Sequence, residues 1–226
     1  GPLINSSGRI AKANDVVELF LTQDDDRIDT IIDKMNSHNE IRKKIEQENL
    51  SLINLKKYYS KNVVFIYNKR FHEGTIGIIA AKLSQLFNKP CFIVTESDGL
   101  LKCSIRSGNN IKINKTINGL MSSKLIISGG GHDEAGGFTA KKKYLSNIED
   151  YLRKEYENLN AKNYSCFDTY TVFPKKNSTI VNDLKSLEPF GKENPEPTFY
   201  FKNIKTVKSQ IINNRHIQNI LKNKSG

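Results

Sequence analysis

The sequence predicts an α/β protein whose mostly parallel sheet is covered by helices on both faces. Between residues 62 and 159, short apolar runs alternate with segments of helical periodicity. A long helical pattern precedes this region, and short strand patterns rich in turn residues follow it. We therefore expect an N-terminal loop and connector helix over residues 1–60, an α/β domain over residues 61–160, and a β portion over residues 164–226.

The composition favours a polyanionic partner. The 226 residues include 35 lysines and arginines against 24 acidic residues, which gives a net charge of +11 and a pI near 9.4. This excess suits nucleic acid better than a membrane, because no basic amphipathic helix stands out. A general abundance of lysine and asparagine would produce the same charge, so composition is weak support by itself.

Cysteine usage and hydropathy predict a cytoplasmic protein. The chain has three cysteines in no CxxC pair, which supports no disulfide framework and fits a reducing compartment. No run of about 18 or more apolar residues is present, so we expect no membrane partner. The chain lacks an initiator Met, and we expect it to be part of a longer protein. The cysteines are Cys91, Cys103 and Cys166.

The first 60 residues predict a loop followed by a long helix. Residues 1–9 are rich in turn formers and end on Arg9, whose guanidinium could fork onto a phosphate. An ordinary capping loop with a solvated Arg9 explains these residues equally well. Asp24 and its two acidic neighbours are expected to cap the next helix. Ile28, Ile31 and Met35 fall at helical spacing, which indicates an amphipathic connector.

The α/β domain begins with a strand over residues 63–67, a helix over residues 75–87 and a second strand over residues 91–95. The helix starts near Gly74, where free backbone N–H groups could meet an anion. Residues 101–106 alternate between apolar and polar side chains, as expected of a third strand.

Two hydroxyls flank an arginine where this third strand ends. Ser104, Arg106 and Ser107 could form a cradle for a phosphate oxygen. An edge strand with outward polar side chains is the alternative. Chemistry alone favours neither.

A glycine-rich segment follows a short helix over residues 116–123. The apolar residues 125–127 predict a buried strand, which is followed by a loop formed by Gly129, Gly130, Gly131 and His132. Glycine lets backbone N–H groups approach a ligand, and histidine can donate to a phosphate or sugar. A tight turn with a surface histidine is the alternative. A strand over residues 138–140 and a helix over residues 145–159 then complete the domain.

The last part of the chain changes pattern. Residues 188–199 hold three prolines and a glycine close together, which predicts a rigid extended turn. Residues 200–207 and 215–221 predict two short strands around Asn213 and Asn214. Lysines and aromatic residues on these strands could bind single strands, or could equally face solvent. These side chains are Tyr200, Phe201, Lys202, Lys205, Lys208, Arg215 and Lys222.

Several motifs resemble known families. Gly130, Gly131, His132, Ala135 and Gly137 match the Gly-Gly-His-x-x-Ala-x-Gly pattern of the DHHA1 domain, the substrate-binding half of the DHH phosphoesterases. Three further segments resemble the RecJ family of single-stranded-DNA-specific exonucleases, including the stretch that introduces its OB-fold. The chain departs from the RecJ pattern at Leu3, where a basic residue is usual, and at Cys103, where glycine is usual. The segments are residues 1–9, 103–107 and 187–197.

The resemblance implies a DHHA1-type fold followed by a truncated OB-fold, in the C-terminal part of a 5′–3′ exonuclease of DNA repair and recombination. Arg9, Ser104, Arg106 and Ser107 would surround the 5′ phosphate of single-stranded DNA. The segment of Gly130, Gly131 and His132 would lie beside the nucleotide. A single-strand-binding protein is a candidate partner, and we expect a monomer.

The resemblance also implies that catalysis occurs elsewhere. The chain has no Asp-His-His triplet, and its four histidines lie far apart with no ligand spacing. The Mg²⁺ or Mn²⁺ of the intact enzyme would be bound by a domain outside this chain. We expect this chain to be inactive alone. Alternatives are a DHH-family phosphodiesterase of short oligonucleotides or cyclic dinucleotides, and a non-catalytic module that binds single-stranded nucleic acid.

Overall fold

The computed structural model describes residues 2–11, 14–108, 111–159, 168–170, 179–191, 194–212 and 216–222. Contacts divide the chain into two compact units, Gly1–Asn163 and Tyr164–Gly226. Each unit is described by itself. Cys166, Asn213, Asn214 and Arg215 lie outside the described residues, so the predictions made for them have no structural counterpart.

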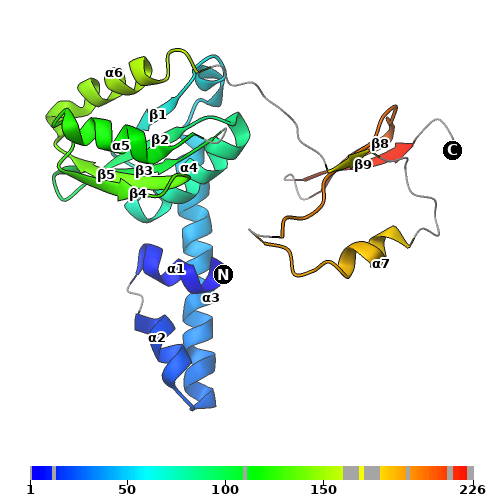
Figure 1. Ribbon diagram of the computed structural model, residues 1–226. Helices are drawn as coiled ribbons and strands as arrows, with labels where there is room; N and C mark the ends of the chain where they lie inside the picture. Colours follow the sequence, from blue (N-terminus) through cyan, green and yellow to red (C-terminus); the bar gives the residue numbers. More distant parts are fainter. Residues whose placement is uncertain are drawn as a thin grey trace. The chain divides into compact units, whose positions relative to one another are not determined.

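Three helices open the first unit (Figure 1): α1 (Pro2–Ile10), α2 (Asn14–Leu21) and α3 (Asp25–Ser51). The expected N-terminal loop is therefore wrong, because α1 is helical up to Ile10. Its serines explain the difference, since they bond to α3 across the helix pair. Ser6 Oγ is 3.4 Å from the carbonyl oxygen of Met35, and Ser7 Oγ is 3.3 Å from His38 Nδ1.

The long connector helix is confirmed as α3. The Asp24 carboxylate accepts a hydrogen bond from the Arg27 backbone N–H, as expected of an N-cap. Near its other end, α3 binds α4 (Glu73–Phe87) through buried polar groups. Asn49 Nδ2 donates to Thr75 Oγ1 at 2.9 Å, and the buried carboxylate of Glu46 forms an ion pair with Lys82. These contacts fix the start of α4 against the connector.

Five strands form one sheet in the order β1-β2-β3-β5-β4. Only β1 and β2 run parallel; the other three pairings are antiparallel. The predicted mostly parallel sheet is therefore corrected to a mixed one, whereas the α/β class is confirmed. The strands are β1 (Val64–Tyr67), β2 (Cys91–Ser97), β3 (Leu100–Arg106), β4 (Ser128–Gly131) and β5 (Ala135–Ala140).

A tight turn causes the antiparallel pairing of β2 with β3. β2 and β3 are joined by Asp98 and Gly99 alone, and both residues have positive φ, of 52° and 72°. Asp-Gly with two positive φ angles is typical of a two-residue hairpin turn, and a hairpin can only join antiparallel strands. Parallel strands need a longer crossover, which α4 supplies between β1 and β2.

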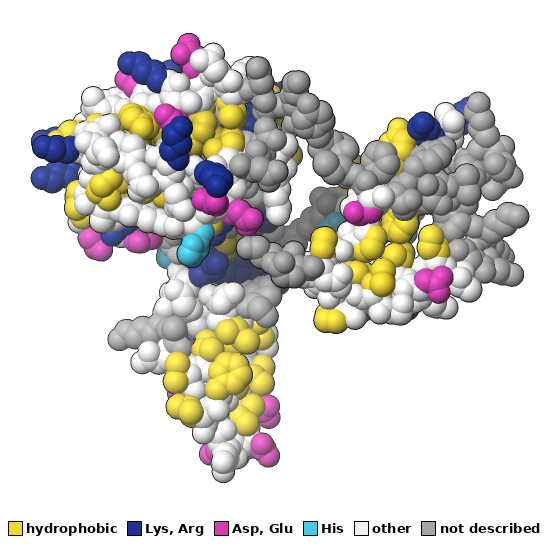
Figure 2. Space-filling model, viewed as in Figure 1, with side chains coloured by type: hydrophobic (Ala, Val, Ile, Leu, Met, Phe, Trp, Pro, Cys, Tyr) yellow, Lys and Arg dark blue, Asp and Glu magenta, His cyan; other side chains and the backbone are white. Residues whose placement is uncertain are grey.

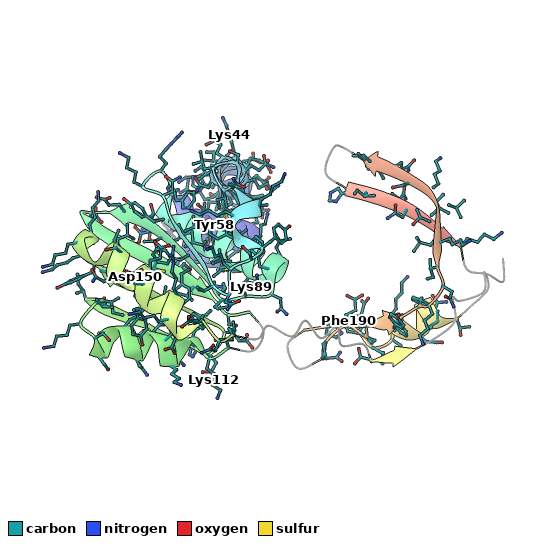
Figure 3. All side chains as sticks on the ribbon, turned by 90° about the horizontal axis from the view of Figure 1, so that it is seen from above. Lys44, Tyr58, Lys89, Lys112, Asp150 and Phe190 are labelled. Carbon is teal, nitrogen blue, oxygen red and sulfur yellow. The ribbon has the colours of Figure 1, made fainter. Side chains whose placement is uncertain are left out.

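Helices cover both faces of the sheet, as predicted. α4 packs on one face over a core that includes Ile79 and Ile93. On the other face, α5 (Ile113–Ser122) and α6 (Leu145–Glu155) enclose a second core around Phe92. Figure 3 shows α6, which carries Asp150, on the side of the sheet away from α3, which carries Lys44. Two short 3₁₀ turns, η1 (Leu55–Tyr58) and η2 (Lys142–Tyr144), complete the unit.

The second unit contains short elements and one hairpin. β6 (Thr169–Tyr170) pairs in parallel with β7 (Phe199–Tyr200), and α7 (Ile180–Lys185) lies between them in sequence. β8 (Lys205–Ile212) and β9 (His216–Lys222) form an antiparallel pair. The predicted pair of strands around Asn213 and Asn214 is thus present, although the first begins at Lys205 rather than near residue 200.

Apolar side chains are exposed on the helical part of the first unit. Val17, Phe20 and Leu21 of α2 are 58%, 71% and 76% exposed. Figure 2 shows hydrophobic side chains gathered over this part of the molecule. Among the residues that the structure describes, no helix is both long enough and apolar enough to cross a bilayer.

Candidate functional site

A cleft of about 1130 Å³ opens in the first unit between the helices and one face of the sheet. One side is formed by the end of α1 and by residues 71–77, which include the first turns of α4. The other side is formed by β3, β5 and β4. This is the α4 face of the sheet, and α4 covers only part of it. The uncovered part is the candidate site.

The alternation of β3 decides which side chains enter the cleft. Its buried residues alternate with half-buried ones, because successive side chains of a strand point to opposite faces. All of the half-buried residues except Leu100 line the cleft. They are Lys102, Ser104 and Arg106.

Two glycines extend this face beside Ser104. The register pairs Ser104 with Gly137 of β5, and Gly137 with Gly130 of β4. A methyl group placed on Gly130 would meet no heavy atom within 4 Å, so the position faces open space. In the row of Ser104, Gly137 and Gly130, the two glycines leave the backbone uncovered by side chains. A flat ring or a sugar could therefore lie directly against this backbone.

Arg9 reaches the cleft because α1 packs closely on α4. A methyl group on Gly74 would lie 1.8 Å from the Arg9 carbonyl oxygen, so only glycine permits this contact. In return, Arg9 Nη1 donates a hydrogen bond to the Gly74 carbonyl oxygen at 3.2 Å. The guanidinium is thereby held at the first turn of α4.

Arg106 faces the same space from β3. Its Nη1 donates to the Ile105 carbonyl oxygen at 2.9 Å. Partial burial lowers the pKa of Arg106 from its ordinary value, and the positive charge of Arg9 lowers it further. An arginine remains charged at neutral pH, so two like charges share one cleft.

Neither guanidinium is neutralised by a carboxylate. Among the described residues, no acidic side chain lies within ion-pair distance of Arg9 or Arg106. Glu96 lines the cleft, but Lys142 Nζ and Tyr67 OH lie within 2.9 Å of its carboxylate. Such an arrangement stabilises a bound anion, and arginine suits phosphate or carboxylate in particular.

The start of α4 is capped internally. The His72 ring accepts a hydrogen bond from the Gly74 backbone N–H at 3.1 Å, through Nδ1. The histidine is therefore the N-cap of α4. It also lines the cleft with Glu73. The helix contributes partial positive charge there, although one of its free N–H groups is already used.

The structure brings together some of the predicted site residues. Arg9, Ser104 and Arg106 line the cleft, whereas Gly130 does not line it but lies on the same face of the sheet by register. Three others do not line it. Ser107 follows β3, and its backbone N–H donates to the Glu134 carbonyl oxygen at 2.8 Å. The remaining two, Gly131 and His132, are exposed at the turn between β4 and β5.

The glycine segment is a strand rather than a loop. Gly129, Gly130 and Gly131 belong to β4, an edge strand that is exposed throughout, so the predicted buried strand followed by a loop is wrong. The two faces of this strand explain the error, because Gly129 leaves room for core side chains on one face and Gly130 meets open space on the other, so neither face shows the apolar pattern of a buried strand. Gly131 has φ of 153°, and a methyl group there would lie 2.3 Å from the Ala135 carbonyl oxygen. The turn therefore requires glycine.

Cys103 does not obstruct the site. A side chain that projected into the cleft in place of the usual glycine would narrow the approach to the backbone. Cys103 is instead 6% exposed and belongs to the core on the opposite face of the sheet. Its burial raises the pKa of the thiol well above the ordinary value, so the thiol remains neutral.

The cleft contains residues that the sequence reasoning missed. Lys102, Ser128 and Thr139 all line it. The period of two along β3 was sufficient to place Lys102 on the same face as Ser104 and Arg106. No comparable signal marked Ser128 or Thr139, because their position depends on the pairing of β3 with β5 and of β5 with β4.

The described residues offer no evident metal site. No group of three or more His, Cys, Asp and Glu side chains within them could hold a metal ion.

Comparison with protein-family models identifies two known domains in the chain. Residues 60–160 match the family model of the DHHA1 domain, and this range holds the five-stranded sheet and all of the cleft lining except Gly8 and Arg9. Residues 167–225 match the model of the RecJ OB domain. The two matches follow one another along the chain, and they confirm the resemblance to the C-terminal part of RecJ exonucleases.

Individual relatives agree with this assignment. The chain is 24% identical over 203 residues to the single-stranded-DNA-specific exonuclease RecJ of Thermus thermophilus, a match that covers 88% of this chain and 29% of the relative. It is 22% identical over 236 residues to RecJ of Bacillus subtilis, with 99% and 30% covered. The chain thus spans about 30% of the length of these relatives.

Solved structures show the same fold. A crystal structure of Thermus thermophilus RecJ in complex with Mn²⁺ gives a TM-score of 0.77 at 21% identity, and covers 97% of this chain and 33% of that one. The complex of the same protein with Mg²⁺ gives a TM-score of 0.74 at 21% identity, with 97% and 35% covered.

Proposed function

We propose that this chain is the C-terminal, substrate-binding part of a RecJ-type 5′–3′ single-stranded-DNA exonuclease. Arg9, Ser104 and Arg106 would bind the 5′ phosphate, and the row of Gly137 and Gly130 would lie beneath the terminal nucleotide. The observation that carries the proposal is a pair of guanidinium groups without carboxylate partners, beside an exposed glycine face.

The geometry suits a terminal phosphate. Two guanidinium groups can each donate two hydrogen bonds to one phosphate, and the Ser104 hydroxyl can donate a further one. A methyl group on Gly77 of α4 would lie 3.2 Å from Ser104 Oγ and 3.9 Å from Arg106 Nη2. The helix therefore packs closely against these two side chains.

Ser107, Gly131 and His132 would act outside the cradle itself. Gly131 ends β4, and Ser107 and His132 directly follow β3 and β4, where the exposed His132 ring could donate to a sugar or phosphate oxygen. We assign them to the nucleotide rather than to the terminal phosphate.

Hydrolysis would depend on residues outside this chain. RecJ structures are solved in complex with Mn²⁺ and with Mg²⁺. Divalent metals in such an enzyme would activate water and stabilise the leaving oxygen. The present chain would hold the strand in position for that step. A DHH-family phosphodiesterase of short oligonucleotides or cyclic dinucleotides is the second candidate, supported by the same cleft. A purely non-catalytic binding module is the third.

The test is whether the chain senses a 5′ phosphate. We would measure the affinity for 3′-labelled oligothymidylate with and without a 5′ phosphate, by fluorescence anisotropy. The phosphorylated strand should bind more tightly, and Arg106→Ala should remove most of that preference. Charge-assisted hydrogen bonds contribute about 1.5–3 kcal/mol, so we expect a loss of about 10- to 100-fold.

Arg153→Ala is the matched control. Arg153 lies on α6, where it forms an ion pair with Glu149 at 2.6 Å, and its removal changes the net charge equally. This variant should keep the preference. Equal affinity of the unmodified chain for both strands would refute the proposal, as would an equal loss in both variants.

A further inference from the structure

Lys102 presents a third positive charge to the same cleft, in addition to those of Arg9 and Arg106. It lies on β3, half-buried, and lines the cavity. Within the described part of the chain, no carboxylate lies within ion-pair distance of its ammonium group. Glu96, an acidic residue of the same lining, is engaged by Lys142.

Hydroxyl groups accompany Lys102 across the sheet. The register pairs Lys102 with Thr139 of β5, and Thr139 with Ser128 of β4. All three line the cleft. A lysine with two hydroxyls in one row can bind a phosphate oxygen by charge and by hydrogen bonds. A solvated lysine on an ordinary strand face would explain its exposure but not its place inside the cavity.

The two charged positions are separated by the row of Ser104, Gly137 and Gly130. Arg106 and Lys102 are four residues apart on β3, and a strand rises about 3.3 Å per residue, so their Cα atoms lie roughly 13 Å apart. The intervening row carries no side chain larger than serine. A ligand that reaches from one end to the other needs two anionic groups and a flat portion between them.

We propose that the row of Lys102, Thr139 and Ser128 is a second phosphate contact, which binds the phosphodiester that follows the terminal nucleotide. The cleft would then recognise at least a 5′-phosphorylated dinucleotide rather than a mononucleotide. This inference rests on the proposed function, because it takes the Arg9 and Arg106 end as the site of the terminal phosphate.

The test compares two probes on the full chain. Thymidine 5′-monophosphate should contact only the Arg106 end, whereas 5′-phosphorylated dithymidylate should contact both ends. We expect Lys102→Met to weaken the dinucleotide about 5- to 10-fold and to leave the mononucleotide unchanged, as measured by isothermal titration calorimetry. It should also make the salt slope shallower by about 0.7, because one phosphate contact is lost.

Two variants serve as controls. Lys115→Met removes the same charge from an exposed position on α5, which covers the opposite face of the sheet, and should change neither affinity. Lys102→Arg keeps the charge and should retain most of the dinucleotide affinity. Circular dichroism melting of each variant establishes that any loss is not a loss of fold.

The outcomes separate this inference from the proposed function. If Arg106→Ala weakens both probes but Lys102→Met weakens neither, or weakens both equally, the second contact is wrong and the terminal phosphate site stands. If Arg106→Ala weakens neither probe, the proposed function fails, and the Lys102 inference fails with it.

Discussion

Gly129 and Gly130 are neighbours in β4, but they face opposite sides of the sheet and have different roles. A methyl group on Gly129 would lie 3.0 Å from Ile126 Cδ1 and from Phe138 Cβ, so this glycine makes room for the core. A methyl group on Gly130 would project into open space on the cleft face. The alternation of a strand thus assigns one glycine to packing and the next to the ligand surface.

This division predicts different results for the same substitution. Gly130→Ala should leave the stability unchanged or slightly higher, since alanine loses less entropy on folding. It should weaken the binding of the 5′-phosphorylated dinucleotide several-fold, because the added methyl group projects from the sheet surface on which the nucleotide would lie. Gly129→Ala should instead cost about 1–3 kcal/mol of unfolding free energy through overpacking. Thermal unfolding and calorimetric titration of both variants would measure this. Loss of stability in Gly130→Ala with unchanged affinity would contradict the assignment.

Among the elements, α1 is the one on which the site depends most. It contributes Arg9, and its position is fixed from two sides. Ser6 and Ser7 bond it to α3, and the missing side chain of Gly74 admits it to α4. Since α3 also binds the first turn of α4 through Asn49, the three helices hold the guanidinium against the sheet.

A second pair of helices, α5 and α6, supports the opposite face and is linked by a buried hydrogen bond. The Tyr156 hydroxyl, just after α6, lies 2.6 Å from Thr116 Oγ1 of α5. Tyr156 is 4% exposed. Burial raises the pKa of Tyr156 to about 12 from an ordinary value of 10.0.

The raised pKa of Tyr156 predicts a loss of stability at high pH. Between pH 10 and 12 the folded chain keeps a proton that the unfolded chain releases, so the free energy of unfolding falls as pH rises, by up to about 3 kcal/mol for this group. Tyr156→Phe should lose about 1 kcal/mol at neutral pH with its hydrogen bond, and should show a smaller fall above pH 10. Urea unfolding at several pH values measures both slopes. Burial also raises the pKa of Cys91 to about 12. Cys91 titrates in both proteins, so its contribution to the fall in stability cancels in the comparison. Parallel slopes would show that Tyr156 titrates normally.

At the scale of the whole molecule, local patterns predicted the elements better than their arrangement. The alternation of residues 101–106 placed Ser104 and Arg106 on one face, and Asp24 caps α3 as expected. The direction of β3 was missed although Asp98-Gly99 is a strong hairpin signal. The helical state of α1 was missed because it depends on distant partners, among them Met35 and His38.

The site was predictable to a similar degree. Each arginine could be named from its local motif, but only the fold shows that both enter one cleft. Gly130 was expected in a loop, where backbone N–H groups would approach a ligand. It lies instead in a strand, where it contributes a flat surface. The net charge of +11 agrees with a polyanionic ligand but does not locate it.

The central claim is that the face formed by β3, β5 and β4 receives the phosphorylated end of a single strand. The most direct measurement is a ¹⁵N NMR titration of the chain with 5′-phosphorylated dithymidylate. We predict that the largest shift changes fall on the backbone amides of Ser104, Arg106, Gly137 and Gly130. Unchanged signals at these four amides, with the main changes on β8 and β9 or on α6 instead, would contradict the account.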